Sequence, residues 1–342
     1  MRRKGEMIRV GDNDKTDAEI VQGALEKLLD KSPLGKFVRL AIRSADPITP
    51  ATTLMHVGFK ENLGNTLALA DFLWTQALNY ALTRKRREQI RARLEGAPPG
   101  DISAIAAPVN AARDAFIEFH KDYPSRASEV GEVLAYCIAV NELGAAQVAA
   151  KMSLKTSGNM PVHGLDGIHA KVEGGALYVF FLESKLSQSA NAGVKDYAES
   201  VAGFGSNLKQ YLLEYSIVRD LGNLDSLTGA ERDLALACFD VMDSPDTVER
   251  RERSVGVILY KEGQFGKLSP VQPRQPVGFH EAEFAAAYAA QLPHHQQAAL
   301  KHLTAGNVDT NKCHVYFVAV PDVDELREQF YMRMGYKPEV KQ

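Results

Sequence analysis

An acid begins one expected strand of this chain, and an acid with a lysine ends the next. Asp166 lies in the segment His-Gly-Leu-Asp-Gly-Ile-His, and seventeen positions later the chain reads Glu183-Ser184-Lys185. If the two strands form a hairpin, both carboxylates and the lysine meet at one end of it. Two carboxylates can bind a hard divalent cation, and a lysine beside that cation can orient or deprotonate a water. These are the parts needed for metal-assisted cleavage of a phosphodiester.

The sequence around these residues favours a hairpin. Apolar residues occupy alternate positions over 166–172, a Glu-Gly-Gly turn signal follows at 173–175, and residues 177–182 are almost wholly apolar. Alternation followed by a Gly-Gly turn is typical of paired strands, and a continuous apolar run is typical of a strand buried on both faces. Because side chains repeat every second residue along a strand, Glu183 and Lys185 are expected on one face.

The same pattern also has a purely structural explanation. An Asp followed at variable distance by Glu-x-Lys is a loose motif, and a Glu-x-Lys at a strand end is often only a solvated edge. The apolar run that leads directly into the charges favours the chemical interpretation, as do the glycines beside Asp166, Gly164 and Gly167, which leave room for a ligand. Ser184 is expected to point to the other face, while its backbone carbonyl can still face a metal.

A third acid lies upstream, in a predicted amphipathic helix over residues 128–140. Apolar residues recur there at helical spacing, at Val130, Val133, Leu134, Cys137 and Ile138. Glu132 lies in the first two turns, next to the apolar stripe, and could therefore reach toward the sheet. The alternative is that Glu129 and Glu132 only favour the helix N-terminus through the macrodipole.

The predicted elements follow one another in the order α-β-β-β-α-β. They are the helix with Glu132, a strand near 152–156, the strand with Asp166, the strand with Glu183 and Lys185, one long helix over 194–218 and a strand over 255–260. This order, with those four residues, resembles the core of the PD-(D/E)XK restriction-endonuclease-like superfamily. Leu165 stands where the superfamily motif has a proline. The resemblance implies an α/β fold with a mixed sheet flanked by helices.

The likeness is narrower over four segments, 131–136, 151–156, 163–169 and 182–185. Together they resemble HamA, the family of nuclease subunits of the Hachiman bacterial anti-phage defence system, over roughly residues 120–320. The resemblance implies a metal-dependent DNA endonuclease held in check by an ATP-driven helicase partner, HamB, as a heterodimer. Release would follow the sensing of damaged or invading DNA.

The expected site is a Mg²⁺ centre at which Mn²⁺ would substitute. Asp166 and Glu183 are expected to bind the cation with the Ser184 carbonyl, and Glu132 to complete the ligand set or hold a metal-bound water. Lys185 is expected to orient the attacking water and help deprotonate it. Contacts with DNA are expected from four further residues, Lys155, His169, Lys195 and Gln210.

Composition is compatible with this function without selecting it. The chain has 342 residues and a formal net charge of −3, so it is not a basic DNA-binding protein as a whole. The three cysteines are widely spaced in apolar contexts without zinc spacing, as expected for buried thiols in a reducing cytoplasm. The sequence has no run of about 18 apolar residues, so no membrane span is expected. The polar sequence after Met-Arg-Arg-Lys argues against a signal peptide.

The chain is expected to divide into an N-terminal α/β region, 1–120, that could dock a partner, and a nuclease domain, 121–342. The first region holds predicted strands at 36–42 and 53–59 and helices at about 64–95 and 104–120. The second ends with a polar linker at 263–278, a helix at 281–292, a strand at 314–320 and a helix at 322–332. His294 and His295 are expected in a loop, and the basic residues of 84–93 on a solvated or partner-facing helix face.

Two other functions fit the same residues. The fold could serve as a non-catalytic subunit that binds DNA or a helicase without cutting. It could also hydrolyse another phosphodiester such as RNA, because recognition of the sugar depends on the shape of the cleft.

Overall fold

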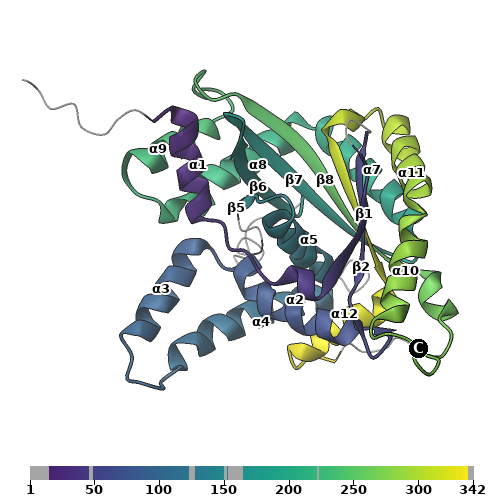
Figure 1. Cartoon of the computed structure of the whole chain (residues 1–342). Coiled ribbons are helices and arrows are strands. Elements are labelled where there is room, and N and C mark those ends of the chain that lie inside the picture. The colour runs from purple at the N-terminus through teal and green to yellow at the C-terminus, as the bar shows by residue number, and fades with distance from the viewer. Residues whose placement is uncertain are drawn as a thin grey trace, which may run out of the picture.

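A single mixed sheet of seven strands forms the centre of the molecule (Figure 1). The computed structural model describes residues 15–45, 49–122, 128–149, 152, 165–221 and 223–337. The sheet has the order β1-β2-β9-β8-β7-β6-β5. Its strands are β1 (Val38–Arg43), β2 (Ala51–Val57), β5 (Ala146–Ala149), β6 (Gly167–Glu173), β7 (Ala176–Ser187), β8 (Arg250–Lys261) and β9 (Cys313–Val320). The predicted α/β class, with a mixed sheet flanked by helices, is confirmed.

The predicted hairpin is present as β6 and β7. The strands pair antiparallel from Gly167 opposite Leu182 to Glu173 opposite Ala176. The turn between them places Gly174 and Gly175 at positive φ, of 57° and 77°, where a residue without a Cβ is favoured. Beyond Leu182, β7 continues beside β8 in parallel pairing. Among the described residues, the last residues of β7 therefore have a strand neighbour on the β8 side and an open edge on the β6 side.

Of the strand expected near 152–156, only Met152 belongs to the described residues. Among the described residues, a strand that the sequence did not predict, β5, follows the Glu132 helix and pairs antiparallel with β6 from Ala146 opposite Ala170. Four small or polar residues, Ala-Gln-Val-Ala, give too short a pattern to stand out, although all four are buried. Residues 153–164 lie outside the described part of the chain.

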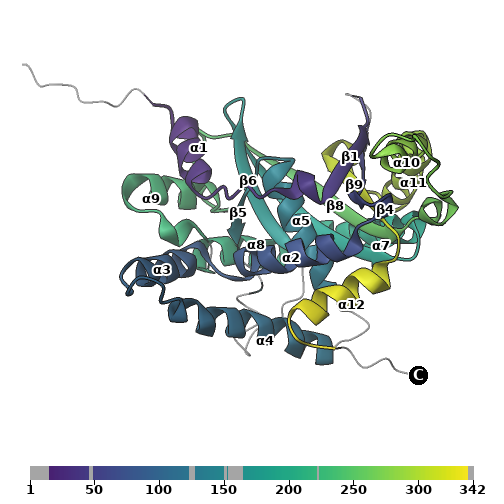
Figure 2. The same cartoon turned by 60° about the horizontal axis from the view of Figure 1, so that its bottom comes forward.

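Helices cover both faces of the sheet. On one face lie α5 (Glu129–Asn141), α2 (Thr66–Ala81) and α12 (Val323–Arg333), as the turned view shows (Figure 2). The other face packs against α7 (Ala190–Gly205), α8 (Leu208–Leu221), α10 (Phe279–Ala289) and α11 (Leu292–Ala305). Odd-numbered residues of β7 from Leu177 to Phe181 face the second layer, and even-numbered ones such as Phe180 and Leu182 face the first.

The single long helix expected over 194–218 was wrong, because the chain breaks between α7 and α8. Ser206 ends α7, and the side-chain oxygen of Asn207 accepts a hydrogen bond from the Gln210 N–H at 3.1 Å, which caps the start of α8. The apolar rows of the two helices happen to continue one another in sequence. Periodicity alone therefore could not reveal the break.

The first part of the chain joins the same sheet as the core. Strand β2 pairs in parallel with β9, and β1 extends the edge beyond it. Helix α1 (Asp17–Lys27), which the sequence analysis missed, packs beside α9 (Gly229–Cys238), where Lys27 pairs with Glu231 at 2.6 Å. The strands of both expected regions thus share one seven-stranded sheet.

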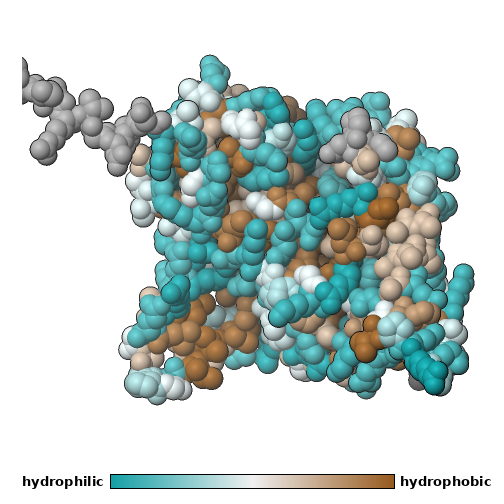
Figure 3. Space-filling view, in the orientation of Figure 1, coloured by the Kyte–Doolittle hydropathy of each residue, from teal (hydrophilic) through white to brown (hydrophobic). Residues whose placement is uncertain are grey.

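Helices α3 (Arg84–Glu95) and α4 (Ala106–Asp122) project together from the body (Figure 1). Figure 3 shows an apolar patch on this projection, where Ile102 is 67% exposed. The predicted breaks and helices of this region are confirmed within a few residues.

The C-terminal third matches its predicted strand and final helix, β9 and α12, within a residue. The loop expected at His294 and His295 was wrong, since both lie in the first turn of α11. His295 is buried and lies 3.2 Å from the Tyr260 hydroxyl, so it is part of the packing under that helix. Within the described part of the chain, every helix is too short or too polar to traverse a lipid bilayer.

Candidate active site at the open end of β7

The end of β7 presents an acid and a base on one face of the sheet. Glu183 and Lys185 form an ion pair with Lys185 Nζ 2.6 Å from Glu183 Oε1. Lys185 Nζ also donates to the Ser200 hydroxyl of α7 at 3.0 Å. Glu183 is 8% exposed, so its charge lies in a largely dehydrated environment. The two partners hold the lysine side chain against the strand from which it comes.

Asp166 occupies the open edge of the same strand. Its Oδ2 accepts two hydrogen bonds from Ser184, one from the backbone N–H and one from the hydroxyl, both at 2.6 Å. The N–H and C=O of one residue point to the same side of a strand. The Ser184 carbonyl therefore faces the edge at which Asp166 lies, as expected from the sequence.

Glu132 approaches from α5 on the opposite face to Glu183. The helix can come this close because residue 131 is a glycine: a Cβ there would lie 2.5 Å from Leu186 Cδ1 and 3.1 Å from Ser184 Oγ. Glu132 is 4% exposed, and its Oε2 accepts a hydrogen bond from the Tyr80 hydroxyl at 2.5 Å. The predicted helix is confirmed, and it directs Glu132 inward against Tyr80.

The negative charges of Glu132 and Glu183 act on the Asp166 carboxyl. Burial, followed by the charges of Glu183 and Glu132, raises the pKa of Asp166 well above its ordinary value, although the two Ser184 hydrogen bonds favour its charged form. Burial, followed by the charges of Glu132 and Asp166, raises the pKa of Tyr80 well above its ordinary value, so its hydroxyl stays a donor. An added positive charge at this place would relieve the repulsion among the acids.

The oxygen donors at the end of β7 have the chemistry that a hard divalent cation requires. Carboxylate and carbonyl oxygens are the ligands that Mg²⁺ and Mn²⁺ prefer. Among the described residues, however, no group of three or more His, Cys, Asp or Glu side chains is arranged to hold a metal ion. The fit therefore rests on Asp166, Glu183 and the Ser184 carbonyl around one strand end, with Glu132 nearby.

The residues predicted to contact DNA are less closely grouped. Lys155 lies outside the described residues. Lys195 is exposed on α7, 3.7 Å from Glu199, and its charge acts on His302 of α11. Gln210 on α8 is partly buried, and its Nε2 donates to Glu214 at 2.9 Å. Lys195 and Gln210 each lie beside an acid other than those of the candidate site, Glu132, Asp166 and Glu183.

His169 is placed where DNA cannot touch it. The side chain is fully buried in β6, beside the Tyr136 ring, and burial lowers its pKa to about 3. Neither ring nitrogen has a hydrogen-bond partner among the described residues. The expected DNA contact of His169 was therefore wrong. The residue lies only three positions after Asp166, but its ring faces the core beneath α5.

Two site residues escaped the sequence analysis. Tyr80 continues the apolar row of α2, and only its hydroxyl distinguishes it from a core phenylalanine there. Ser200 lies on α7, fifteen positions after Lys185, in a stretch without any motif. A polar atom within an otherwise apolar helical face was the one available signal for Tyr80.

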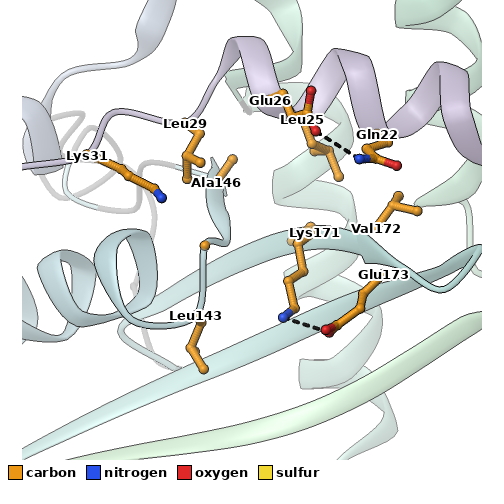
Figure 4. A pocket seen from close by; sticks show the side chains of 12 residues that line it. Gln22, Leu25, Glu26, Leu29, Lys31, Leu143, Ala146, Lys171, Val172 and Glu173 are labelled. Carbon is orange, nitrogen blue, oxygen red and sulfur yellow. Dashed lines mark hydrogen bonds and ion pairs between the residues drawn. The ribbon is translucent and has the colours of Figure 1, made fainter.

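A cavity of about 300 Å³ lies elsewhere, between α1 and the edge formed by β5 and β6 (Figure 4). Four of the polar side chains that line it form two pairs, Lys171 with Glu173 at 2.7 Å and Gln22 with Glu26 at 2.9 Å, and Lys31 lines it as well. None of the predicted catalytic residues lines it. The cavity is therefore separate from the candidate site at the end of β7.

Comparison with known proteins agrees with the resemblance noted in the sequence. No curated protein and no solved structure matched the chain. The model of the HamA family matches residues 36–334, which include the whole seven-stranded sheet, all four predicted catalytic residues and Tyr80. The chain therefore belongs to the HamA family of anti-phage defence proteins.

Proposed function

We propose that this protein is a Mg²⁺-dependent DNA endonuclease acting in anti-phage defence. The observation that carries the proposal is the pairing of Asp166 with Ser184 beside the Glu183–Lys185 ion pair, all at the open end of β7. Oxygen ligands and a cationic side chain there meet the needs of phosphodiester hydrolysis.

Each residue has a distinct role in this proposal. Asp166, Glu183 and the Ser184 carbonyl would hold the divalent cation, and Glu132 would add a ligand or hold a water. The bound cation would stabilise negative charge on the phosphate as the bond to the leaving oxygen breaks. Lys185, held by Glu183 and Ser200, would position the attacking water at its Nζ and assist removal of its proton.

The test is cleavage of plasmid DNA with Mg²⁺ or Mn²⁺ by the wild type, Glu183→Ala and Lys185→Ala. Both variants are expected to lose cleavage while circular dichroism shows an intact fold. Ser206→Ala is the matched control, since that hydroxyl lies on an exposed residue at the end of α7 and donates to the Gly203 backbone oxygen at 3.0 Å. Retained cleavage in both active-site variants would remove the assignment, and an RNA substrate tested in parallel distinguishes the two nucleic acids.

One observation favours a second candidate, a non-catalytic subunit that binds DNA or a helicase. The described acids do not form a ready three-ligand metal cluster. Calorimetry with Mn²⁺ on the wild type and Asp166→Ala decides between the two functions. Equal heats for both proteins would support the non-catalytic role, whereas loss of binding in the variant supports the endonuclease.

We further propose that a helicase partner regulates the nuclease as a heterodimer. A nuclease that cuts DNA without sequence preference must be restrained in its host, and a chain of net charge −3 has little phosphate-neutralising capacity of its own. The basic face of α3 supports a docking role in part. Arg84 and Arg87 are committed to Asp30, at 2.6 and 2.5 Å, while Arg86 and Arg93 are exposed.

Co-purification of this chain with a helicase of the HamB type tests the proposed partnership. A stable complex is expected, with cleavage that depends on ATP or on damaged DNA, and Arg86→Glu with Arg93→Glu is expected to weaken assembly. Charge reversal at Lys301, an exposed residue of α11, serves as the control. Failure of the chains to associate, or equal cutting in every condition, would contradict the proposal.

A further inference from the structure

One buried tyrosine links two segments of the proposed site. Tyr80, in the last turn of α2, is 1% exposed. Its hydroxyl donates to Glu132 Oε2 at 2.5 Å and lies 3.3 Å from the backbone oxygen of Asp166. A single side chain from the N-terminal part of the chain therefore contacts both the helix and the strand that supply acids.

The backbone around Tyr80 is anchored as well. Its carbonyl accepts a hydrogen bond from the Gln147 side chain of β5 at 3.3 Å. The Gln147 carbonyl in turn accepts from Asn223 Nδ2 at 2.8 Å, and Asn223 Oδ1 accepts from the Arg84 N–H at 2.7 Å. All of these side chains are buried or nearly so. The end of α2 is thus fixed to the sheet and to the 3₁₀ turn that contains Asn223.

A buried tyrosine commonly has a hydrogen-bond partner, and such a bond by itself indicates only a role in packing. Tyr80 differs because its partner is a carboxylate. A hydroxyl that donates to a carboxylate selects one rotamer of that carboxylate and makes a stronger bond than it makes to a neutral acceptor. Here the same hydroxyl contacts the Glu132 carboxylate and the backbone oxygen of Asp166, so the selected rotamer keeps the Glu132 carboxylate close to the segment that carries Asp166.

We propose that Tyr80 is a positioning residue that holds Glu132 in place for binding of the divalent cation. This inference rests on the proposed function of the site. Groups that orient a metal ligand typically contribute about 10- to 100-fold to metal affinity. Tyr80 touches neither substrate nor cation in this scheme and acts only through Glu132.

The same helix supplies a matched control. The Tyr331 hydroxyl of α12 donates to Glu129 Oε2 at 2.5 Å, and both residues are fully buried. Glu129 precedes Glu132 by three positions on α5, so the two tyrosine–glutamate pairs share a helix, a geometry and a degree of burial. Of these two glutamates, only Glu132 is proposed to bind the cation or hold a water on it.

The experiment measures Mn²⁺ binding by calorimetry in the wild type, Tyr80→Phe and Tyr331→Phe, with metal-free thermal unfolding alongside. Both variants are expected to lower the unfolding temperature, because each loses one buried hydrogen bond. Tyr80→Phe alone is expected to weaken Mn²⁺ binding tenfold or more. The losses of Mn²⁺ affinity caused by Tyr80→Phe and Glu132→Gln should not add in the double variant, since both changes act on one carboxylate.

Equal Mn²⁺ affinity in Tyr80→Phe and Tyr331→Phe overturns the inference while leaving the proposed function standing. Absence of Mn²⁺ binding in the wild type overturns both. If Tyr80→Phe does not fold, Gln147→Met takes its place, since it removes the donor to the Tyr80 carbonyl with similar side-chain volume. That variant is expected to weaken Mn²⁺ binding by a smaller factor, and an unchanged affinity counts against the inference.

Discussion

Asp166 accepts two hydrogen bonds from Ser184 on one carboxylate oxygen, from the backbone N–H and from the hydroxyl, each 2.6 Å long. The pairing lies on the β6 side of β7, where no described strand pairs with β7 beyond Leu182. It therefore holds the Asp166 carboxylate in the plane of the sheet, between Glu183 on one face and Glu132 on the other. The position explains why both acids raise the pKa of Asp166.

Replacing Asp166 by Asn should separate stability from metal binding. Burial and neighbouring acids disfavour the charged form, so the metal-free folded protein loses stability as pH rises from the ordinary carboxyl pKa toward the raised one. Asp166→Asn removes that charge, while the amide oxygen can still accept from Ser184. Thermal unfolding without metal should therefore be unchanged or shifted upward at pH 7. The stabilisation that Mn²⁺ gives the wild type should disappear, and a variant that Mn²⁺ still stabilises equally would count against the ligand role.

Glu132→Gln should raise the Mg²⁺ concentration needed for cleavage. The amide oxygen can still accept from Tyr80, so packing is preserved and only the charge is lost. If Glu132 served only as an N-terminal helix charge, the change would cost up to about 1 kcal/mol of stability and leave the metal titration unaltered. Superimposable Mg²⁺ titrations of variant and wild type would decide for that simpler role.

Gly131→Ala should disturb the site through packing. The added Cβ would lie 2.5 Å from Leu186 Cδ1 and 3.1 Å from Ser184 Oγ, the hydroxyl that binds Asp166. Overpacking of this kind costs about 1 to 3 kcal/mol, and displacement of Ser184 should reduce cleavage more than stability. Gly203→Ala in α7 is the control, since nothing lies within 4 Å and the gain in helix propensity is up to about 1 kcal/mol. Chemical denaturation and cleavage rates of both variants provide the measurement.

Stability at mild acid pH should depend on His169. Its pKa is lowered to about 3 in the folded chain from an ordinary value of about 6.5. Between these values the unfolded chain binds the extra proton, so folded stability falls as pH falls below about 6.5. At about 1.4 kcal/mol per pH unit, the loss from pH 7 to 5 is about 2 kcal/mol. His169→Phe should remove that part of the pH dependence in urea unfolding, and an unchanged slope would show that the ring is hydrated.

The sequence by itself determined the hairpin, its turn and the acids at its end, because strand alternation, a Gly-Gly turn and an apolar run are local properties of neighbouring residues. It also indicated that Glu132 lies beside the apolar stripe of its helix, and the order of elements around the site. The family match agrees with the resemblance that those residues suggested.

Only the tertiary structure decided which partners these residues meet. Tyr80 and Glu132 are fifty-two positions apart, and an apolar helical row cannot show that one hydroxyl within it faces a carboxylate. Alternation likewise could not show that His169 lies under α5, since a period of two does not reveal which face is covered. The break between α7 and α8 depends on a cap at Asn207. Local patterns record that a side chain is buried, whereas its partner depends on how distant elements pack.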